Sequence, residues 1–474
     1  MMMQLKDKNL LVLGLGDTGL SALRWLSNQP KHNQVASLSV ADTRVEFNTA
    51  ALKVELPNVD IHLGEYPVAL LKQADLIVIS PGVPLATPAV QVAIQAGVRV
   101  IGDVELFAQV RSKSSKVIAI TGTNGKTTVT SLVGAMCKAA RLKTIVAGNI
   151  GLPVLDTLSM ESPDVYVLEL SSYQLETTSS LQADVATVLN VSQDHLDRYN
   201  GSEAEYAAAK ARVYIGCNYQ VLNLDDVFSR GMADTQKKQA WISLSAPKSP
   251  KHYGVIIEND QTWLCQGNTK LFNRAELQLA GTHNVVNALA AIALCHGIGL
   301  KTGQFIDALA AFKGLPHRVE FVAEIDGVTY YDDSKGTNVG STIAALSGLN
   351  QAELDQADLD QSELNQKVVL ILGGDGKDQD FTPLAKPVTE YARAIVLIGR
   401  DADKIADALS DTNIPQYHAA DLSEAVTIAR KFALGGDAVL LSPACASFDM
   451  FNNYIHRAEV FVEAVNRLKA EVAA

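Results

Sequence analysis

Short runs of apolar residues alternate along the chain with longer stretches in which apolar residues recur at helical spacing. The short runs are rich in Val, Ile and Leu, and the clearest are 9–13, 74–80, 116–120, 164–169 and 368–372. Runs of this kind, bounded by glycine and polar turns, are typical of strands buried on both faces of a parallel sheet. The alternation predicts an α/β fold in which helices cover parallel sheets. Residues 241–271 instead alternate between polar and apolar, which predicts hairpins.

The length of the chain requires more than one domain. Its 474 residues are enough for about three domains of ordinary size. We predict an N-terminal Rossmann-like domain over 1–104, a central domain with a P-loop ATPase-like parallel sheet over 105–314, and a C-terminal Rossmann-like domain over 315–474. The acidic, glutamine-rich segment 351–366 is predicted to be an exposed insertion without chemistry.

Composition and charge exclude several classes of protein. The chain is 47% apolar and 19% charged, with a net charge of −12, which argues against broad binding to nucleic acids or acidic membranes. Its five cysteines are scattered without metal-binding spacing, so we expect reduced thiols. The apolar run 9–15 is too short for a membrane span or a signal peptide. We therefore expect a cytoplasmic monomer with no nucleic-acid partner and no membrane insertion.

The strongest chemical signal lies at 118–129, where an apolar strand, a glycine-containing turn and a helix follow one another. Backbone N–H groups and the helix dipole favour an anion at such a junction. Lys126 can reach a β- or γ-phosphate, and the Thr127 hydroxyl can coordinate Mg²⁺. The loop is shorter than the usual P-loop, because its leading glycine is Gly122. The alternative, a glycine-rich turn with a surface lysine, explains the context less well.

A second glycine pattern precedes this loop. Gly14, Gly16 and Gly19 form a G-x-G-x-x-G fingerprint, and Asp42 follows at about the distance of a ribose-binding acid. Taken alone, the pattern predicts a nicotinamide-dependent dehydrogenase. That hypothesis leaves the loop at 118–129 unexplained, and the first unit is short for a dinucleotide fold. The next strand ends at 80–82, Ser-Pro-Gly, which is either a ligand-binding strand end or a plain turn.

Several charged residues follow strands of the predicted central sheet. Glu169 ends an apolar strand beside the phosphate loop, where a Mg²⁺-binding carboxylate is expected, although a solvent-exposed acid is the simpler alternative. Asp194, His195 and Asp197 follow the next strand and indicate a polar site there. Lys210 lies on a predicted helix and, from its pattern alone, is expected on a solvated face.

Two further groups of polar residues occur later in the chain. Asn284 and Asn287 lie one helical turn apart, so they could hold an adenine edge or a phosphate, or simply be ordinary polar residues of a helix. Asp333, Lys335 and Thr337 lie where a strand passes into a helix, and this placement suits a nucleotide or a carboxylate ligand.

Together these motifs resemble the Mur ligase family, which builds the peptide stem of bacterial peptidoglycan, over essentially the whole chain. The shared motifs are TGTNGKT at 121–127, ELSS at 169–172, DHLD at 194–197, His283 and Asn284 with Asn287, LPHRVE at 315–320 and DSKGTN at 333–338. Within the family, three further motifs are similar to the members that add D-glutamate: DTR at 42–44, GGDGK at 373–377 and SPACASFD at 442–449.

The resemblance implies a reaction and its substrates. ATP would phosphorylate the L-alanine carboxylate of UDP-N-acetylmuramoyl-L-alanine, and the amine of D-glutamate would attack the acyl phosphate. The resemblance implies that ATP is bound by Gly122, Thr123, Asn124, Gly125, Lys126, Thr127, Thr128, Asn284, Arg318 and Asp333. It implies that the UDP precursor is bound by Gly14, Gly16, Gly19, Asp42, Thr43, Arg44, Ser80, Pro81, Gly82 and Asn149.

The remaining roles also come from the resemblance. D-Glutamate would be bound by Thr337, Lys377, Ser447 and Tyr454. Mg²⁺ would be bound by Thr127, Glu169, His195 and Lys210, the last as a carbamate. The catalytic residues would be Lys126, His195, Lys210 and Lys335. Because the sites lie in three domains, we predict hinges near 103–116 and 312–318 and chemistry only in a closed form.

Three alternatives remain at this stage. A dehydrogenase would bind NADH. A non-catalytic ATP switch would need Lys126 but not Glu169, His195 and Lys335 together. Another Mur-type or folylpolyglutamate-type ligase would share the chemistry and use a different amino acid.

Overall fold

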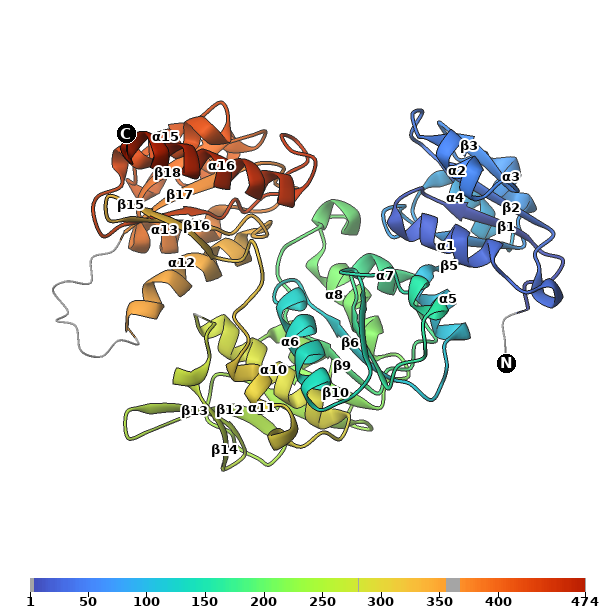
Figure 1. The fold of residues 1–474 in the computed structure, drawn as a ribbon, viewed down its shortest axis with the longest axis horizontal. Coiled ribbons are helices and arrows are strands. Elements are labelled where there is room, and N and C mark those ends of the chain that lie inside the picture. Colours follow the sequence, from blue (N-terminus) through green and yellow to red (C-terminus); the bar gives the residue numbers. More distant parts are fainter. Residues whose placement is uncertain (1–3, 280, 355–366, 474) are drawn as a thin grey trace.

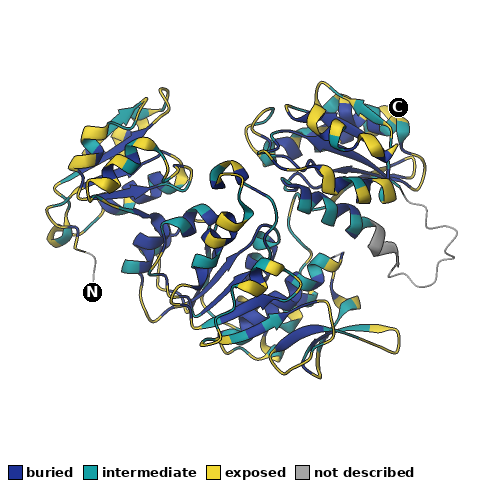
Figure 2. Cartoon of the chain, turned by 180° about the vertical axis from the view of Figure 1, so that it is seen from behind, coloured by how far each residue is buried: buried dark blue, intermediate teal, exposed yellow. Residues whose placement is uncertain are grey.

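The computed structural model describes residues 4–279, 281–354 and 367–473. The described residues form three sheets, each with its own helices. Figure 1 shows them as three separate units that follow one another along the chain. Strands form the buried interior of each unit, and exposed residues gather on the outer faces of the helices (Figure 2). None of the described helices is long and apolar enough to cross a membrane.

The first sheet is parallel, with the strand order β3-β2-β1-β4-β5. Its strands are β1 (Asn9–Leu13), β2 (Ser37–Asp42), β3 (Val59–Leu63), β4 (Leu76–Ile79) and β5 (Arg99–Gly102). Its helices are α1 (Asp17–Ser27), α2 (Thr49–Glu55), α3 (Val68–Gln73) and α4 (Pro88–Gln95). The strand order reverses between β1 and β4, and ligands of open α/β sheets bind at such a switch point.

The turn after β1 depends on close packing at one glycine. We expect Gly19→Ala to lower the melting temperature by roughly 2–10 °C, because the added methyl group would lie 1.9 Å from the Gly14 carbonyl oxygen. Gly16→Ala is the matched control, since its methyl group would meet nothing within 4 Å. Thermal melting followed by circular dichroism compares the two variants. Equal melting temperatures would contradict this account of the turn.

The central sheet has the strand order β14-β13-β12-β11-β10-β9-β6-β8-β7. Its strands are β6 (Lys116–Thr121), β7 (Thr144–Gly148), β8 (Val165–Glu169), β9 (Val185–Val188), β10 (Tyr219–Asn223), β11 (Lys238–Ile242), β12 (His252–Glu258), β13 (Gln261–Gln266) and β14 (Thr269–Asn273). β12, β13 and β14 pair antiparallel, which confirms the hairpins. The predicted hairpin segment begins too early, because its first residues belong to β11, which pairs parallel with β10.

Helices cover the central sheet and connect it to its neighbours. They are α5 (Asp103–Val110), α6 (Lys126–Ala139), α7 (Ser172–Glu176), α8 (Glu203–Ala211), α9 (Val227–Gly231), α10 (Thr282–Gly297) and α11 (Ile306–Ala310). α5 joins the first two units: Phe107 packs edge-on against Tyr166 of the central sheet at 5.0 Å between ring centroids. One continuous hydrophobic cluster therefore runs from the first sheet into the central one.

The third sheet has the strand order β15-β16-β20-β17-β18-β19, and only β15 and β16 pair antiparallel among its described strands. The strands are β15 (Glu320–Ile325), β16 (Val328–Asp332), β17 (Val368–Gly373), β18 (Ala392–Ile398), β19 (Gln416–His418) and β20 (Ala438–Leu441). The helices are α12 (Val339–Leu354), α13 (Ala385–Tyr391), α14 (Ala402–Ala408), α15 (Leu422–Phe432) and α16 (Tyr454–Ala473). Of the predicted insertion, residues 351–354 end α12, and 355–366 lie outside the described residues.

Candidate active site

A cavity of about 600 Å³ lies at the switch point of the first sheet and extends to the central one. It brings together nearly all residues predicted for the UDP precursor: Gly14, Gly16, Asp42, Thr43, Arg44, Ser80, Pro81, Gly82 and Asn149. Gly19 is absent from the lining, because it packs behind the loop against Gly14. Residues 80–82 line this cavity, which favours a ligand-binding strand end over a plain turn.

Asp42 accepts hydrogen bonds that order the residues lining this cavity. Its carboxylate accepts hydrogen bonds from the Leu15 backbone N–H at 2.7 Å and from Nε and Nη2 of Arg44 at 2.9 Å each. Burial would raise the pKa of Asp42, but the bonds from Arg44 and Leu15 outweigh it and lower the pKa. The ionised carboxylate thus fixes the glycine turn and points a half-exposed Arg44 guanidinium at the cavity.

The phosphate loop runs from β6 to the N-terminus of α6. Gly125 has φ +81°, and a methyl group there would lie 2.5 Å from the Asn287 side-chain oxygen, so only glycine lets α10 approach the loop. Asn287 donates to Asn284 at 3.0 Å, which places the predicted asparagine pair beside the loop. Lys126 donates to the carbonyls of Gly122 at 2.9 Å and Thr123 at 2.7 Å.

Glu169 lies at the end of β8, in register with the end of the strand that leads into the phosphate loop. Its side chain is 1% exposed, and Oε1 accepts a hydrogen bond from Asn149 at 2.7 Å. Oε2 is buried and has no hydrogen-bond partner among the described residues. A buried carboxylate oxygen without a donor suits a divalent cation, because Mg²⁺ takes oxygen ligands. The solvent-exposed alternative for Glu169 is wrong.

Lys210 corrects a prediction made from pattern. It was expected on a solvated face of its helix, yet it is 1% exposed and donates to the Gly122 carbonyl at 2.8 Å. Its ammonium lies 4.2 Å from the centre of the Tyr206 ring. Burial, and then the charge of Lys126, lower the pKa of Lys210 well below its usual value. The Mg²⁺-binding role that the resemblance implies for Lys210 stays a prediction.

The pKa values of His195 and Asp194 are both lowered, for different reasons. Burial lowers the pKa of His195 to about 4, so its imidazole is neutral near pH 7. Burial would raise the pKa of Asp194, but Lys377 and His195 bring it down to about 2. His195 Nδ1 lies 2.8 Å from the Tyr173 hydroxyl. His195 Nε2 lies 3.6 Å from Asp194.

Side-chain contacts that include Lys377–Asp194, Asn338–Asn124 and Asn338–Asp194 connect the third domain to the central one. Lys377 Nζ contacts Asp194 Oδ1 at 2.5 Å. Asn338 and Asn124 exchange hydrogen bonds of 3.0 and 3.2 Å. Lys377, predicted to bind a substrate carboxylate, therefore holds a carboxylate of the protein in this conformation. An exchange of backbone hydrogen bonds between Asp375 and Ala446 keeps its loop beside the one that carries Ser447.

Lys335 lies beside Tyr454, another residue predicted for the site in the third domain. Its ammonium lies 3.8 Å from the centre of the Tyr454 ring, and burial, with Arg318 nearby, lowers the pKa of Lys335 to about 8. Burial also lowers the pKa of Arg318, an effect that Asp333 and Glu169 oppose. Asp333 accepts from Ser442 at 2.6 Å, and burial raises the pKa of Asp333 to about 7. The charges of Lys126 and Lys377 also lower the pKa of Lys335, so these side chains are close enough to interact electrostatically.

Comparisons with known proteins cover nearly the full chain. Residues 8–102 match the model of the Mur ligase MurD-like N-terminal domain, 120–295 the Mur ligase middle domain, and 317–445 the Mur ligase glutamate ligase domain. A UDP-N-acetylmuramoylalanine–D-glutamate ligase from Methylobacillus flagellatus is 57% identical over 100% of both chains. The protein of the same name from Nitrosomonas europaea is 49% identical over 98% of each.

The chain belongs to the Mur ligase family.

Solved structures confirm the Mur ligase fold. The pseudomurein peptide ligase type C of Methanothermus fervidus matches with a TM-score of 0.59 at 19% identity, over 98% of this chain and 100% of that one. The UDP-N-acetylmuramate–alanine ligase MurC of Thermotoga maritima gives 0.58 at 19% identity with the same coverage. At such identity these matches establish the shared fold alone. The α/β class with three sheet-based units, predicted from the sequence, is confirmed.

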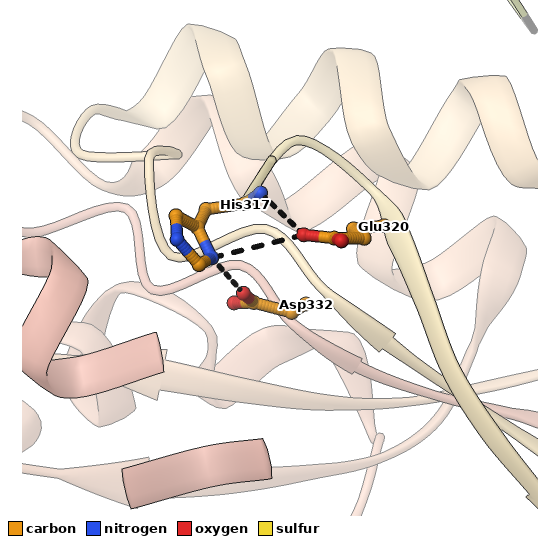
Figure 3. A group of neighbouring side chains, drawn as sticks. All are labelled: His317, Glu320 and Asp332. Carbon is orange, nitrogen blue, oxygen red and sulfur yellow. Dashed lines mark hydrogen bonds and ion pairs between the residues drawn. The ribbon is translucent and has the colours of Figure 1, made fainter. Parts of the chain in front are cut away.

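The sequence of this Mur ligase indicated no role for His317. Figure 3 shows His317 beside Asp332 and Glu320: Nδ1 lies 2.7 Å from Asp332, and the His317 backbone N–H donates to Glu320 at 2.7 Å. The Lys335 N–H donates to the His317 carbonyl at 3.2 Å. These bonds hold His317, Glu320 and Asp332 together and fix the turn that carries Arg318. They explain this group of side chains without a metal.

Asp194 and Asn338 were also missed as partners across the domain boundary. Asp194 was noted only as part of a polar site, and Asn338 only as the end of a motif. Their partners are Lys377 and Asn124, 183 and 214 residues away in sequence. The sequence indicated only that Asp194 and Asn338 belong to motifs, and a motif does not indicate which side chain of another domain its residues contact.

Proposed function

We propose that this Mur ligase uses ATP to join D-glutamate to UDP-N-acetylmuramoyl-L-alanine in peptidoglycan precursor synthesis. The observation that carries the reaction type is Asn149, which lines the cavity of the first domain and donates to Glu169 at the phosphate loop. A precursor in the cavity would therefore extend toward the nucleotide phosphates. The choice of D-glutamate is supported by full-length relatives of that name at 45–57% identity.

The chemical problem is that a carboxylate is a poor electrophile. Its oxygen attacks the γ-phosphorus of ATP, the bond to ADP breaks, and an acyl phosphate results. This step brings anions together, so it needs positioning and positive charge. Lys126 and the N–H groups of 122–128 would hold the phosphates, and Lys335 and Arg318 would add charge from the third domain. Asn284 and Asp333 would contribute to the nucleotide site.

Mg²⁺, when bound, would neutralise phosphate charge. Thr127 and Glu169 would hold one ion, and the unpartnered oxygen of Glu169 fits that role. His195 and a carbamylated Lys210 would hold a second. His195 and Lys210 both belong to the central domain, and Lys210 contacts the phosphate loop there.

D-Glutamate would bind against the third domain, at Thr337, Lys377, Ser447 and Tyr454. Lys377 would release Asp194 and pair with a substrate carboxylate. The free amine would then attack the acyl carbon, phosphate would leave, and the nitrogen would lose a proton to give the amide. Domain movement about the predicted hinges near 103–116 and 312–318 would bring these groups together. We expect a monomer acting in the cytoplasm.

We predict that Asp42→Asn raises the KM for the UDP precursor about 10–100-fold while kcat and the KM for ATP change less than about threefold. The reason is that the charged contacts between Asp42 and Arg44 are lost, and these order the cavity. Asp60→Asn, an exposed site on the neighbouring β3, is the control. Steady-state kinetics measures both variants. An unchanged KM for the precursor would remove Asp42 from the site.

The proposed function is tested by phosphate release with Mg-ATP and UDP-N-acetylmuramoyl-L-alanine, adding one amino acid at a time. We expect release with D-glutamate and none above background with L-glutamate, L-alanine or a diamino acid. Release with another amino acid would keep the ligase chemistry and change the substrate. Glutamate addition to a folate would indicate a folylpolyglutamate-type ligase. No release with any pair would reject the ligase.

A further inference from the structure

A cluster of side chains connects the cavity of the first domain with His195. We call it the Tyr173 cluster, and it consists of Tyr173, Glu176, Arg198 and Tyr199. Tyr173 and Glu176 come from α7, and the other two from the 3₁₀ turn Leu196–Tyr199 that begins directly after His195. None of these four residues has a role in the proposed reaction described above.

Tyr173 controls one nitrogen of the His195 ring. Its hydroxyl lies 2.8 Å from Nδ1, and the two rings meet edge-on at 5.0 Å between centroids. The other nitrogen, Nε2, lies 3.6 Å from Asp194, which is too long for a hydrogen bond. A neutral imidazole carries one proton, so the partner of Nδ1 decides whether Nε2 presents a lone pair.

Arg198 connects this histidine to the first domain. Nη1 donates to the Pro81 carbonyl at 3.1 Å, in the strand-end loop of the cavity, and Nη2 donates to Glu176 at 2.7 Å. Its guanidinium carbon lies 4.1 Å from the centre of the Tyr173 ring. The side chains of Arg198 and Glu176 are only 9% and 15% exposed, so the pair is protected from solvent. An unbroken series of contacts therefore runs from Pro81 through Arg198 and Tyr173 to His195.

We infer that Tyr173 and Arg198 are positioning residues for His195. Tyr173 accepts a hydrogen bond from Nδ1–H, so Nε2, on the side of Asp194, carries the lone pair. Arg198 holds the Tyr173 ring and the Pro81 carbonyl at once, so docking of the first domain sets the orientation of His195. A histidine that offers one nitrogen as a ligand commonly donates the other ring N–H to a fixed acceptor. The inference rests on the proposed function for the role of His195, but not for its tautomer.

The tautomer is measured on the ligand-free full chain by ¹⁵N NMR of histidine-labelled protein. The chain has nine histidines, and loss of one signal set in His195→Gln assigns His195. We expect the Nδ1–H form in the wild type and a mixture of tautomers in Tyr173→Phe, which keeps the ring and removes the acceptor. A wild-type protein with the proton on Nε2 would overturn the inference, whatever the activity.

Kinetics then separates the two positioning residues. We expect Tyr173→Phe to lower kcat about 10–100-fold with the KM for the UDP precursor unchanged. Arg198→Gln should lower kcat and also raise that KM, because the Pro81 contact is lost. If the two residues act through one orientation of His195, the double variant will have the kcat of the worse single variant. A kcat loss equal to the product of the two single losses would show independent effects and reject the coupling.

Tyr199→Phe is the matched control. It removes a phenol hydroxyl from the same cluster, the donor to Glu176 at 2.7 Å, and leaves the Tyr173–His195 and Arg198–Pro81 contacts in place. We expect the wild-type tautomer and a kcat within about threefold of wild type. If Tyr199→Phe changes the tautomer as much as Tyr173→Phe, the effect belongs to packing and the inference fails. If no amino acid supports turnover, the proposed function fails, while the NMR result still decides the role of Tyr173.

Discussion

Replacing Lys126 by methionine is expected to reduce turnover at least about 10³-fold while the protein stays folded. Lys126 is the cation at the N-terminus of α6, and its ammonium lies within the loop at 2.9 Å from the Gly122 carbonyl and 2.7 Å from the Thr123 carbonyl. Preorganised charge at a transferring phosphate is among the largest single contributions to catalysis. Methionine keeps the length of the side chain and removes the charge. Phosphate release under saturating substrates measures the loss.

The control for this variant is Lys138→Met on the same helix. Lys138 is exposed at the far end of α6, so its loss is expected to leave turnover within about twofold of wild type. Thermal melting of both variants excludes unfolding as the cause. If Lys126→Met retains more than about a tenth of wild-type turnover, the loop does not hold the phosphate that is transferred.

Removing CO₂ is expected to inactivate the wild-type enzyme reversibly. Lys210→Met should lower turnover roughly 10²–10³-fold, and the turnover of this variant should not respond to CO₂. Burial lowers the pKa of Lys210 well below its usual value, so more of its amine is neutral at a given pH. The amine can attack the carbon of CO₂ and lose a proton, which gives a carbamate with two oxygens able to bind a cation. The chemistry converts a buried cation into an anion beside Glu169.

The carbamate is detected directly with ¹³C-bicarbonate. We expect one ¹³C NMR signal from the labelled wild-type chain that is absent from Lys210→Met. Bicarbonate should also restore the activity of CO₂-depleted wild type and leave the variant unchanged. Full activity without CO₂, together with no ¹³C signal, would show that Lys210 acts as an amine. Its bond to the Gly122 carbonyl would then be its main contribution.

The sequence predicted the architecture because that information is local. Strands such as β6 and β8 are continuous apolar runs, and the glycine turns follow them directly. Glu169 could be placed beside the phosphate loop because parallel strands present their carboxyl ends at one edge. The same reasoning left Ser80 and its neighbours as either a ligand-binding strand end or a plain turn, and the cavity lies there.

Side-chain burial and long-range pairing could not be predicted in this way. Lys210 was misplaced by its pattern, because burial of a helical residue depends on which element meets that face, here the phosphate loop. The Lys377–Asp194 pair depends on how two domains are arranged, and no local pattern encodes that. Asp42 was predicted to contact the UDP precursor, and no local pattern indicates that it also accepts hydrogen bonds from Leu15 and Arg44. The domain boundaries and hinges remain predictions.

The most direct test of the account follows an oxygen atom. UDP-N-acetylmuramoyl-L-alanine labelled with ¹⁸O in its L-alanine carboxylate is incubated with Mg-ATP and D-glutamate, and the released phosphate is analysed by mass spectrometry. An acyl-phosphate ligase transfers one ¹⁸O from the carboxylate to each phosphate, and the release depends on D-glutamate. Phosphate without ¹⁸O, or labelled release that proceeds equally with L-glutamate, would contradict the account.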